Sequence, residues 1–137
     1  MSDATRPTRV LVVDDEPAIL RSTAYILKDL GYDVYTCGEA REILSVARDA
    51  TPDVVLQDVR MPGLDLERTV TALRSEAQRE LRLILFTASL EGEELAERLH
   101  ADAFIPKPFR PAELVEALGP AERAGAPAGG GPTGQPQ

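Results

Sequence analysis

Five polar side chains in this chain lie at or just after the end of a short apolar run: Asp14, Asp15, Asp58, Thr87 and Lys107. Carboxylates that lie close together repel one another, and burial raises their pKa unless a cation is present. Hard oxygen ligands, without histidine or cysteine among them, suit Mg²⁺. If these residues meet, they form a site with three carboxylates, one hydroxyl and one ammonium that would bind Mg²⁺.

Lys107 is unusual for its residue type. The chain has 13 Arg and only two Lys, so a Lys at this place indicates a need for a compact point charge rather than a planar guanidinium. Numbers this small also allow chance as the explanation. The flanking prolines, Pro106 and Pro108, predict a rigid turn with a cis peptide bond between Lys107 and Pro108.

Other polar residues have simpler interpretations. Asp58, taken alone, could merely start the turn that Pro62 and Gly63 continue. His100 lies at the end of a predicted helix and is expected to be a surface residue rather than a ligand. Cys37, the only cysteine, is expected to be a small core residue, and it excludes an intrachain disulfide and a multi-cysteine metal site.

The five polar residues can meet only if the apolar runs before them belong to one sheet. Five runs without helical period predict buried strands: 10–13, 34–37, 53–58, 83–86 and 104–105. Each run is followed by a segment with apolar residues at helical spacing, of which the fourth is short and weakly apolar. This alternation predicts an α/β fold with a parallel sheet, whose strands end along one edge, where ligands bind.

Composition sets limits on the class of protein. The chain has 137 residues, of which 43% are hydrophobic, which suits one globular domain. Its net charge of -8 argues against direct binding of nucleic acid by this domain. The sequence contains no apolar run long enough to span a membrane and no apolar leader, so a cytoplasmic location is expected.

The ends of the chain differ from the middle. Residues 1–8 are polar and are expected to be flexible, and residues 9–119 form the predicted domain. Half of residues 120–137 are Gly or Pro, without an apolar stripe, which predicts a disordered tail or a linker stub.

Four segments, taken together, resemble the CheY-like receiver domain of bacterial two-component response regulators. They are LVVDDE (11–16), LQDVRMPG (56–63), LFTAS (85–89) and FIPKPF (104–109). Each motif is short, but four motifs in the right order at the ends of successive strands are specific. The resemblance covers roughly residues 8–119 and implies a flavodoxin-like (βα)5 fold, a doubly wound parallel sheet with strand order 2-1-3-4-5.

The resemblance also implies roles for individual residues. Asp58 would be the nucleophile that accepts a phosphoryl group from a sensor histidine kinase or a histidine phosphotransfer protein in a phosphorelay. Lys107 would pair with one phosphoryl oxygen, and the Thr87 hydroxyl would bind another and so report phosphorylation. Phe104 occupies the position of the switch aromatic residue of the family.

The metal ligands implied by the resemblance come from three places in the chain. Asp15 and Asp58 would bind Mg²⁺ directly, and Asp14 would act through water. The backbone carbonyl of Arg60 would complete the protein ligands. Mg²⁺ and the lysine would then offset the charge on the phosphoryl oxygens during transfer.

The implied function is a phosphorylation-dependent signalling switch rather than an enzyme that turns over a separate substrate. Magnesium-dependent self-phosphorylation from small donors and slow autodephosphorylation are expected. A downstream protein or domain would read the state through the face formed by the fourth helix, fifth strand and fifth helix. Two features depart from the family pattern: Leu66 stands where a Gly is usual, and the interval from Thr87 to Lys107 is slightly short.

Two alternatives stay open at this point. A haloacid dehalogenase-type phosphohydrolase also uses an aspartate at a strand end, but that class needs a second acid two residues later, where this chain has Arg60. A degenerate receiver would bind partners without phosphorylation, and the intact set of Asp15, Asp58, Thr87 and Lys107 argues against it.

Overall fold

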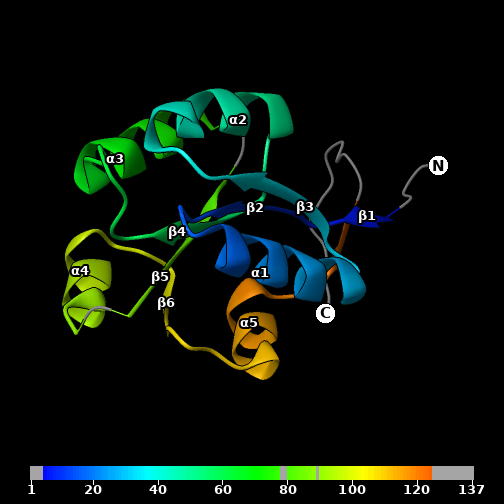
Figure 1. Ribbon diagram of the computed structural model, residues 1–137. Helices are drawn as coiled ribbons and strands as arrows, with labels where there is room; N and C mark the ends of the chain where they lie inside the picture. Colours follow the sequence, from blue (N-terminus) through cyan, green and yellow to red (C-terminus); the bar gives the residue numbers. More distant parts are fainter. Residues whose placement is uncertain (1–4, 78–79, 89, 125–137) are drawn as a thin grey trace.

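A five-stranded parallel sheet forms the centre of the molecule (Figure 1). The structure is a computed structural model that describes residues 5–77, 80–88 and 90–124. Across the sheet the strands follow the order β3 (Asp33–Cys37), β2 (Arg9–Val13), β4 (Val54–Asp58), β5 (Arg82–Thr87) and β6 (Ala103–Pro106). Counted along the chain, these five strands have the order 2-1-3-4-5, so the predicted topology is confirmed.

Helices cover both faces of this sheet. They are α1 (Pro17–Asp29), α2 (Ile43–Ala50) with the preceding 3₁₀ turn η1 (Ala40–Glu42), α3 (Leu66–Glu76), α4 (Gly92–Arg98) and α5 (Pro111–Leu118). Figure 1 shows α1 and α5 on one side of the sheet and α2 and α3 on the other. The apolar residues of α4 pack in the same core as those of α2 and α3. In the part of the chain that is described, no helix is both long and apolar enough to cross a membrane.

The central strands are buried on both faces because their side chains alternate between two cores. In β2, Val10 and Val12 pack in the core between the sheet and helices α1 and α5. Leu11 and Val13 pack in the other core, with α2, α3 and α4. All four side chains are fully buried. This alternation fixes the register of the sheet, since a slip of one residue would exchange the two cores.

Local signals in the sequence set the ends of several helices. Pro17 occupies the first turn of α1, and Gly31 follows that helix with a φ of 101°, a backbone angle that suits glycine. The side chain of Asp65 accepts a hydrogen bond from the backbone N–H of Arg68 and so caps α3. With this cap in place, α3 begins at Leu66.

The two ends of the described chain form a second, two-stranded sheet. β1 (Thr5–Pro7) pairs antiparallel with β7 (Glu122–Ala124). The predicted flexible N-terminus (1–8) and disordered tail (120–137) are therefore wrong at these two strands. The remaining part of the predicted tail, 125–137, lies outside the described residues.

Hydrogen bonds anchor the chain that leads from α5 into β7. The backbone N–H of Thr8 donates to the carbonyl of Ala121 over 2.6 Å, and the Thr8 hydroxyl donates to the carbonyl of Pro120 over 2.8 Å. The buried Tyr32 hydroxyl donates to the carbonyl of Gly119. These donors lie far from residues 119–121 in sequence, which is why the composition of the tail did not predict the contact.

A buried carboxylate attaches β1 to the main sheet. Asp53 is 1% exposed, and both of its oxygens accept hydrogen bonds from the Arg6 guanidinium, over 2.8 and 2.9 Å. The backbone N–H of Arg9 also donates to Asp53 over 2.9 Å. A bidentate guanidinium–carboxylate pair of this kind is strong and directional, so it holds the N-terminal strand in place.

We expect Arg6→Ala to lower the free energy of unfolding by roughly 2 kcal/mol, because it leaves the buried Asp53 carboxylate without its guanidinium. Urea unfolding measures the change. The matched control is Arg41→Ala, which removes an ion pair with Glu39 whose side chains are 82% and 55% exposed. That control should cost less than about 0.5 kcal/mol. Equal effects of the two variants would show that β1 is not held by this pair.

Candidate functional site

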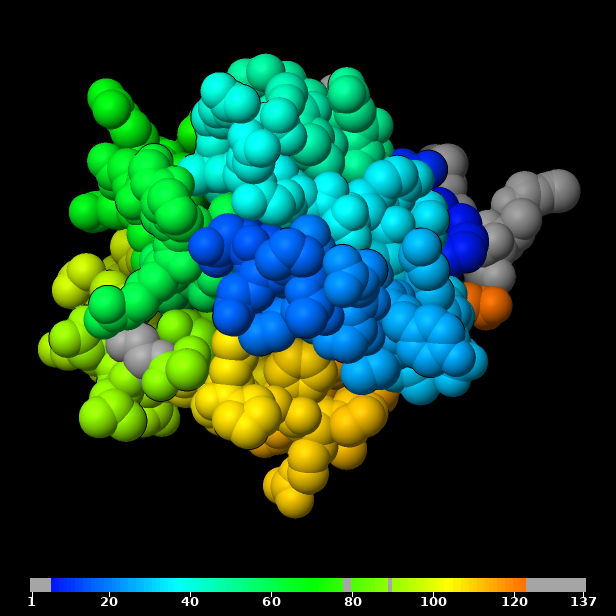
Figure 2. Space-filling model, in the orientation of Figure 1, coloured from blue at the N-terminus to red at the C-terminus, as the bar shows by residue number. Residues whose placement is uncertain are grey.

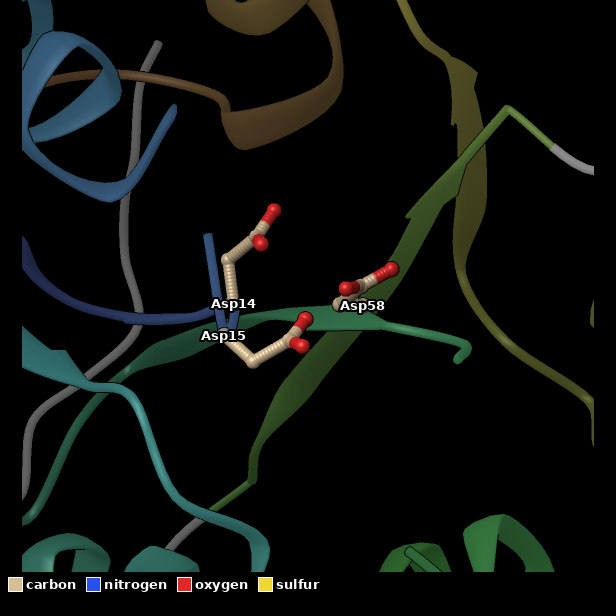
Figure 3. Close-up of side chains that lie close together, drawn as sticks. All are labelled: Asp14, Asp15 and Asp58. Atoms are coloured by element: carbon tan, nitrogen blue, oxygen red, sulfur yellow. The ribbon is translucent and has the colours of Figure 1, made fainter. Parts of the chain in front are cut away.

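Three carboxylates meet at the carboxyl edge of the sheet (Figure 3). Asp14 and Asp15 directly follow β2, and Asp58 is the last residue of β4. Each offers an oxygen, and these oxygens lie within 4.8 Å of one another. Asp14 and Asp58 are buried, whereas Asp15 is exposed. The cluster forms because β2 and β4 are parallel neighbours, so residues that follow their last pair reach the same edge.

Lys107 contributes the cation of the site. Its Nζ atom lies 2.6 Å from Oδ2 of Asp14 and 3.4 Å from Oδ1 of Asp58, and its side chain is only 11% exposed. The backbone N–H of Lys107 donates to the carbonyl of Thr87 over 3.0 Å, which fixes the start of the turn after β6. The peptide bond between Lys107 and Pro108 is cis, as the two prolines predicted.

The two buried carboxylates differ in what surrounds them. Both oxygens of Asp14 already accept hydrogen bonds, Oδ1 from the backbone N–H of Glu16 over 2.9 Å and Oδ2 from Lys107. Asp58 has a more distant ammonium, and its Oδ1 lies 3.5 Å from the backbone nitrogen of Arg60. Asp58 is therefore the less satisfied of the two carboxylates.

Burial raises the pKa of Asp58 from 3.8 to about 6. The charge of Lys107 opposes this rise, the charge of Asp14 adds to it, and the hydrogen bond from the backbone of Arg60 opposes it. A cation placed beside a buried carboxyl group stabilises its ionised form. Asp58 would therefore be stabilised as a carboxylate by a further positive charge.

Thr87 ends β5, and Phe104 lies on the neighbouring strand β6, opposite Leu85. Thr87 is buried, and Phe104 is half-buried with its ring in the core that α4 shares. Gly92, the first residue of α4, explains how the ring fits. A methyl group at Gly92 would lie 2.3 Å from Cε1 of Phe104 and 2.7 Å from the Thr87 methyl group. Only glycine leaves room for this contact, so Gly92 joins the two predicted switch residues to α4.

Arg60 lies at the mouth of the site. Its guanidinium is 72% exposed and lies 4.0 Å from the Glu91 carboxylate, which precedes α4. The pair therefore links the loop after β4 to the loop after β5. That the Arg60 carbonyl binds a metal stays a prediction.

Two residues of this site did not stand out in the sequence. Gly92 lies within a weakly apolar helix, and Phe86 belongs to an apolar strand, so each has an ordinary local explanation. Phe86 is fully buried, and the Nζ atom of Lys107 lies over its ring, 4.6 Å from the centroid. The signal that could have found it is its position directly before Thr87, at the end of a strand next to β6.

Comparison with known proteins agrees with this geometry. The family model described as the response regulator receiver domain matches residues 10–119. The chain belongs to this family. The match includes the three carboxylates, Thr87 and Lys107, and it coincides closely with the predicted domain, 9–119.

Solved receiver structures share the fold of this family member. The chemotaxis protein CheY4 of Vibrio cholerae has a TM-score of 0.73 and 32% identity, over 82% of this chain and 96% of that one. A CheY-like receiver domain protein of Methanospirillum hungatei JF-1 has a TM-score of 0.71 and 31% identity, over 80% and 89% of the two chains.

Longer regulators are also similar to this receiver chain. The DNA-binding response regulator MtrA of Mycolicibacterium smegmatis is 31% identical over 113 residues, which cover 81% of this chain and 49% of that protein. The transcriptional regulatory protein PhoP of Bacillus subtilis is 36% identical over 110 residues, which cover 77% and 45%. The chain thus spans about half the length of the curated relatives it matches. The expectation that this domain does not itself bind nucleic acid stays a prediction.

The raised pKa of Asp58 predicts how stability depends on pH when no metal is added. Between pH 4 and 6 the folded chain keeps a proton on Asp58 that the unfolded chain has released, so rising pH lowers stability through that window. Asp58→Asn removes this penalty. We expect the variant to be more stable than the parent by on the order of 2 kcal/mol at pH 7.5, with a much smaller difference near pH 4. Urea unfolding with EDTA at a series of pH values measures this, and a difference that is independent of pH would contradict it.

Proposed function

We propose that this receiver domain is a switch in which Asp58 accepts the phosphoryl group. The observation that carries the proposal is the position of Asp58 at the end of the buried central strand, 3.4 Å from the Lys107 ammonium and within 4.8 Å of two other carboxylates. Asp14 and Asp15 do not end a strand in this way, and Asp14 has both oxygens engaged. Of the two buried carboxylates, Asp58 is the one with an oxygen left to attack phosphorus.

The donor set fits Mg²⁺, which prefers carboxylate and carbonyl oxygens and keeps several waters. Asp15 and Asp58 would hold the ion directly, with the carbonyl of Arg60. Asp14 would act through a water molecule, which agrees with the two hydrogen bonds its oxygens already accept. When bound, Mg²⁺ offsets the negative charge on the oxygens of the transferring phosphoryl group.

The donor would be a phosphohistidine of a sensor histidine kinase or a phosphotransfer protein. An oxygen of Asp58 forms the new bond to phosphorus, and the P–N bond breaks with its electron pair going to the imidazole. The ammonium of Lys107 turns from Asp14 to a phosphoryl oxygen, which it neutralises. Small donors such as acetyl phosphate would react in the same way, with acetate as the leaving group.

Thr87 would transmit the effect of phosphorylation from the site to the rest of the domain. Phosphorylation adds about -1.5 to -2 charge at pH 7 and new acceptor oxygens. The Thr87 hydroxyl can donate to one of them, and its methyl group shares a small space with Phe104 and Gly92. A shift of Thr87 therefore changes the packing of Phe104 and the start of α4. A downstream partner would read the face formed by α4, β6 and α5.

One residue weighs against the phosphohydrolase alternative. Arg60 stands two residues after Asp58, where that class of enzyme needs an acid. Its side chain is a guanidinium that lies near Glu91, so it cannot act as that acid.

The burial of Lys107 weighs against the other alternative, a receiver that has lost phosphorylation. Such a receiver would not need Lys107 buried between two carboxylates, because such a cation is costly to desolvate.

We expect incubation with acetyl phosphate and Mg²⁺ to add one phosphoryl group to the intact protein, as measured by mass spectrometry. Asp58→Asn should abolish the adduct, because it removes the nucleophilic oxygen. An adduct of the same yield on the variant would refute the assignment.

Two further variants test the metal in the same assay. Asp15→Ala should slow formation of the adduct at low Mg²⁺ concentration by about tenfold or more, since it removes a direct ligand. Asp49→Ala, which removes an exposed carboxylate at the end of α2, where the chain leads to the opposite end of β4 from Asp58, should behave like the parent protein.

The switch proposal predicts that beryllofluoride, a phosphoryl mimic, shifts NMR signals across residues 87–118. In Thr87→Ala most of that response should disappear, because the hydroxyl that detects the mimic is gone. Thr71→Ala, an exposed threonine on α3, is the matched control and should keep the full response. A parent-like response in Thr87→Ala would mean that the coupling does not run through this residue.

A second variant tests the same route from its other end. Gly92→Ala should move the Phe104 ring signals before any mimic is added, because the new methyl group would overlap the ring. Unchanged ring signals would show that Phe104 does not depend on the space at Gly92.

A further inference from the structure

We propose that Phe86 is a positioning residue for Lys107: the face of its ring holds the ammonium in place while the anionic partner of the ammonium changes. The inference deepens the proposed function and rests on it for the role of Lys107. The contact itself is a property of the unphosphorylated chain and is tested separately.

The geometry places the ammonium among three attractive groups. The Nζ atom of Lys107 lies 4.6 Å from the centroid of the Phe86 ring, 2.6 Å from Asp14 and 3.4 Å from Asp58. The ring distance is well within the range of a cation–π interaction. Phe86 is fully buried and the Lys107 side chain is 11% exposed, so little water weakens the attraction.

The sheet and a second aromatic residue fix the ring. Phe86 pairs with Ile105 across β5 and β6, and Ile105 precedes Lys107 by two residues, so the register brings the ring and the lysine together. The ring of Phe109 lies 6.3 Å from that of Phe86, centroid to centroid, at 52°. This tilted contact restricts the Phe86 ring. The ring is therefore a rigid support for a flexible side chain.

An aromatic face suits this role because it carries no net charge. To reach a phosphoryl oxygen on Asp58, the ammonium must leave Asp14, which is now its nearest partner. A divalent cation bound at the carboxylates would also repel the ammonium toward water. A further carboxylate in place of the ring could retain the ammonium but would repel the phosphoryl donor. The ring attracts the ammonium without repelling the donor.

The competing explanation is that Phe86 only fills the core. Leucine at this position would keep most of the apolar contacts but lose the negative face of the ring. A truncation can also destabilise the fold, so a graded change in the electronics of the ring separates the two explanations better than its removal.

The decisive experiment replaces Phe86 by phenylalanine carrying one, two or three fluorine atoms, which progressively weaken the attraction of the ring for a cation at little change in size. The measured quantity is the rate of Asp58 phosphorylation by acetyl phosphate with Mg²⁺. We expect the rate to fall stepwise, by about fivefold for the trifluorinated ring. The same series at Phe109, which contacts Phe86, is the matched control and should leave the rate nearly constant. Equal rates throughout the Phe86 series, or equal declines in both series, would overturn the proposal.

A second measurement needs no phosphorylation. In the unphosphorylated protein, the ring should displace the NMR signals of the Lys107 side-chain methylene groups next to Nζ, and Phe86→Leu should return them to the values of an ordinary lysine. Undisplaced signals in the parent protein would overturn the contact. If the parent shows displaced signals but no phosphorylation of Asp58, the proposed function fails while the contact stands.

Discussion

Two buried carboxylates stay side by side in this fold because an ammonium lies between them. Asp14 and Asp58 would repel strongly in a buried setting, and Lys107 reaches both of them with a side chain that is 11% exposed. The arrangement depends on the sheet order, which sets β2 beside β4 and brings β6 to the same edge. It also depends on the alternation of each strand, because a register slip would turn these residues toward the wrong core. The apolar cores thus determine where the charges meet.

The same constraint leaves Asp58 only partly compensated, and this has a chemical consequence. With its pKa raised to about 6, a proton would compete at weakly acidic pH with the metal ion that the proposed function places at the same oxygens. Asp14 differs from it, because a backbone N–H and Lys107 already donate hydrogen bonds to its two oxygens. Asp14 and Asp58 therefore lie side by side in different surroundings. In the proposed function, one orients the lysine and the other is left to react.

The sequence predicted most of the fold and the members of the site, because both depend on local pattern. Strand alternation and the residue that ends each strand are visible in the sequence, and Lys107 stood out in a chain rich in arginine. The missed features depend on contacts between distant residues. The strand β1 is held by hydrogen bonds between Arg6 and Asp53, which lies 47 residues later in the sequence. Gly92 and Phe86 have ordinary neighbours in the sequence. Only the folded structure shows that the Phe104 ring lies beside Gly92 and that the Lys107 ammonium lies over the Phe86 ring.

The two ends of helix α4 are held in different ways. At its start, Gly92 cannot accept even a methyl group without meeting Phe104 and Thr87, the two predicted switch residues. At its end, the guanidinium of Arg74, from α3, donates to the carbonyls of Leu99 and His100 over 2.7 and 2.5 Å. The C-terminal end of this short helix is thus hydrogen-bonded to α3, whereas its start packs closely against Phe104 and Thr87. In the proposed switch, a displacement of Thr87 would therefore act first on the start of α4, while the hydrogen bonds from Arg74 would hold its C-terminal end.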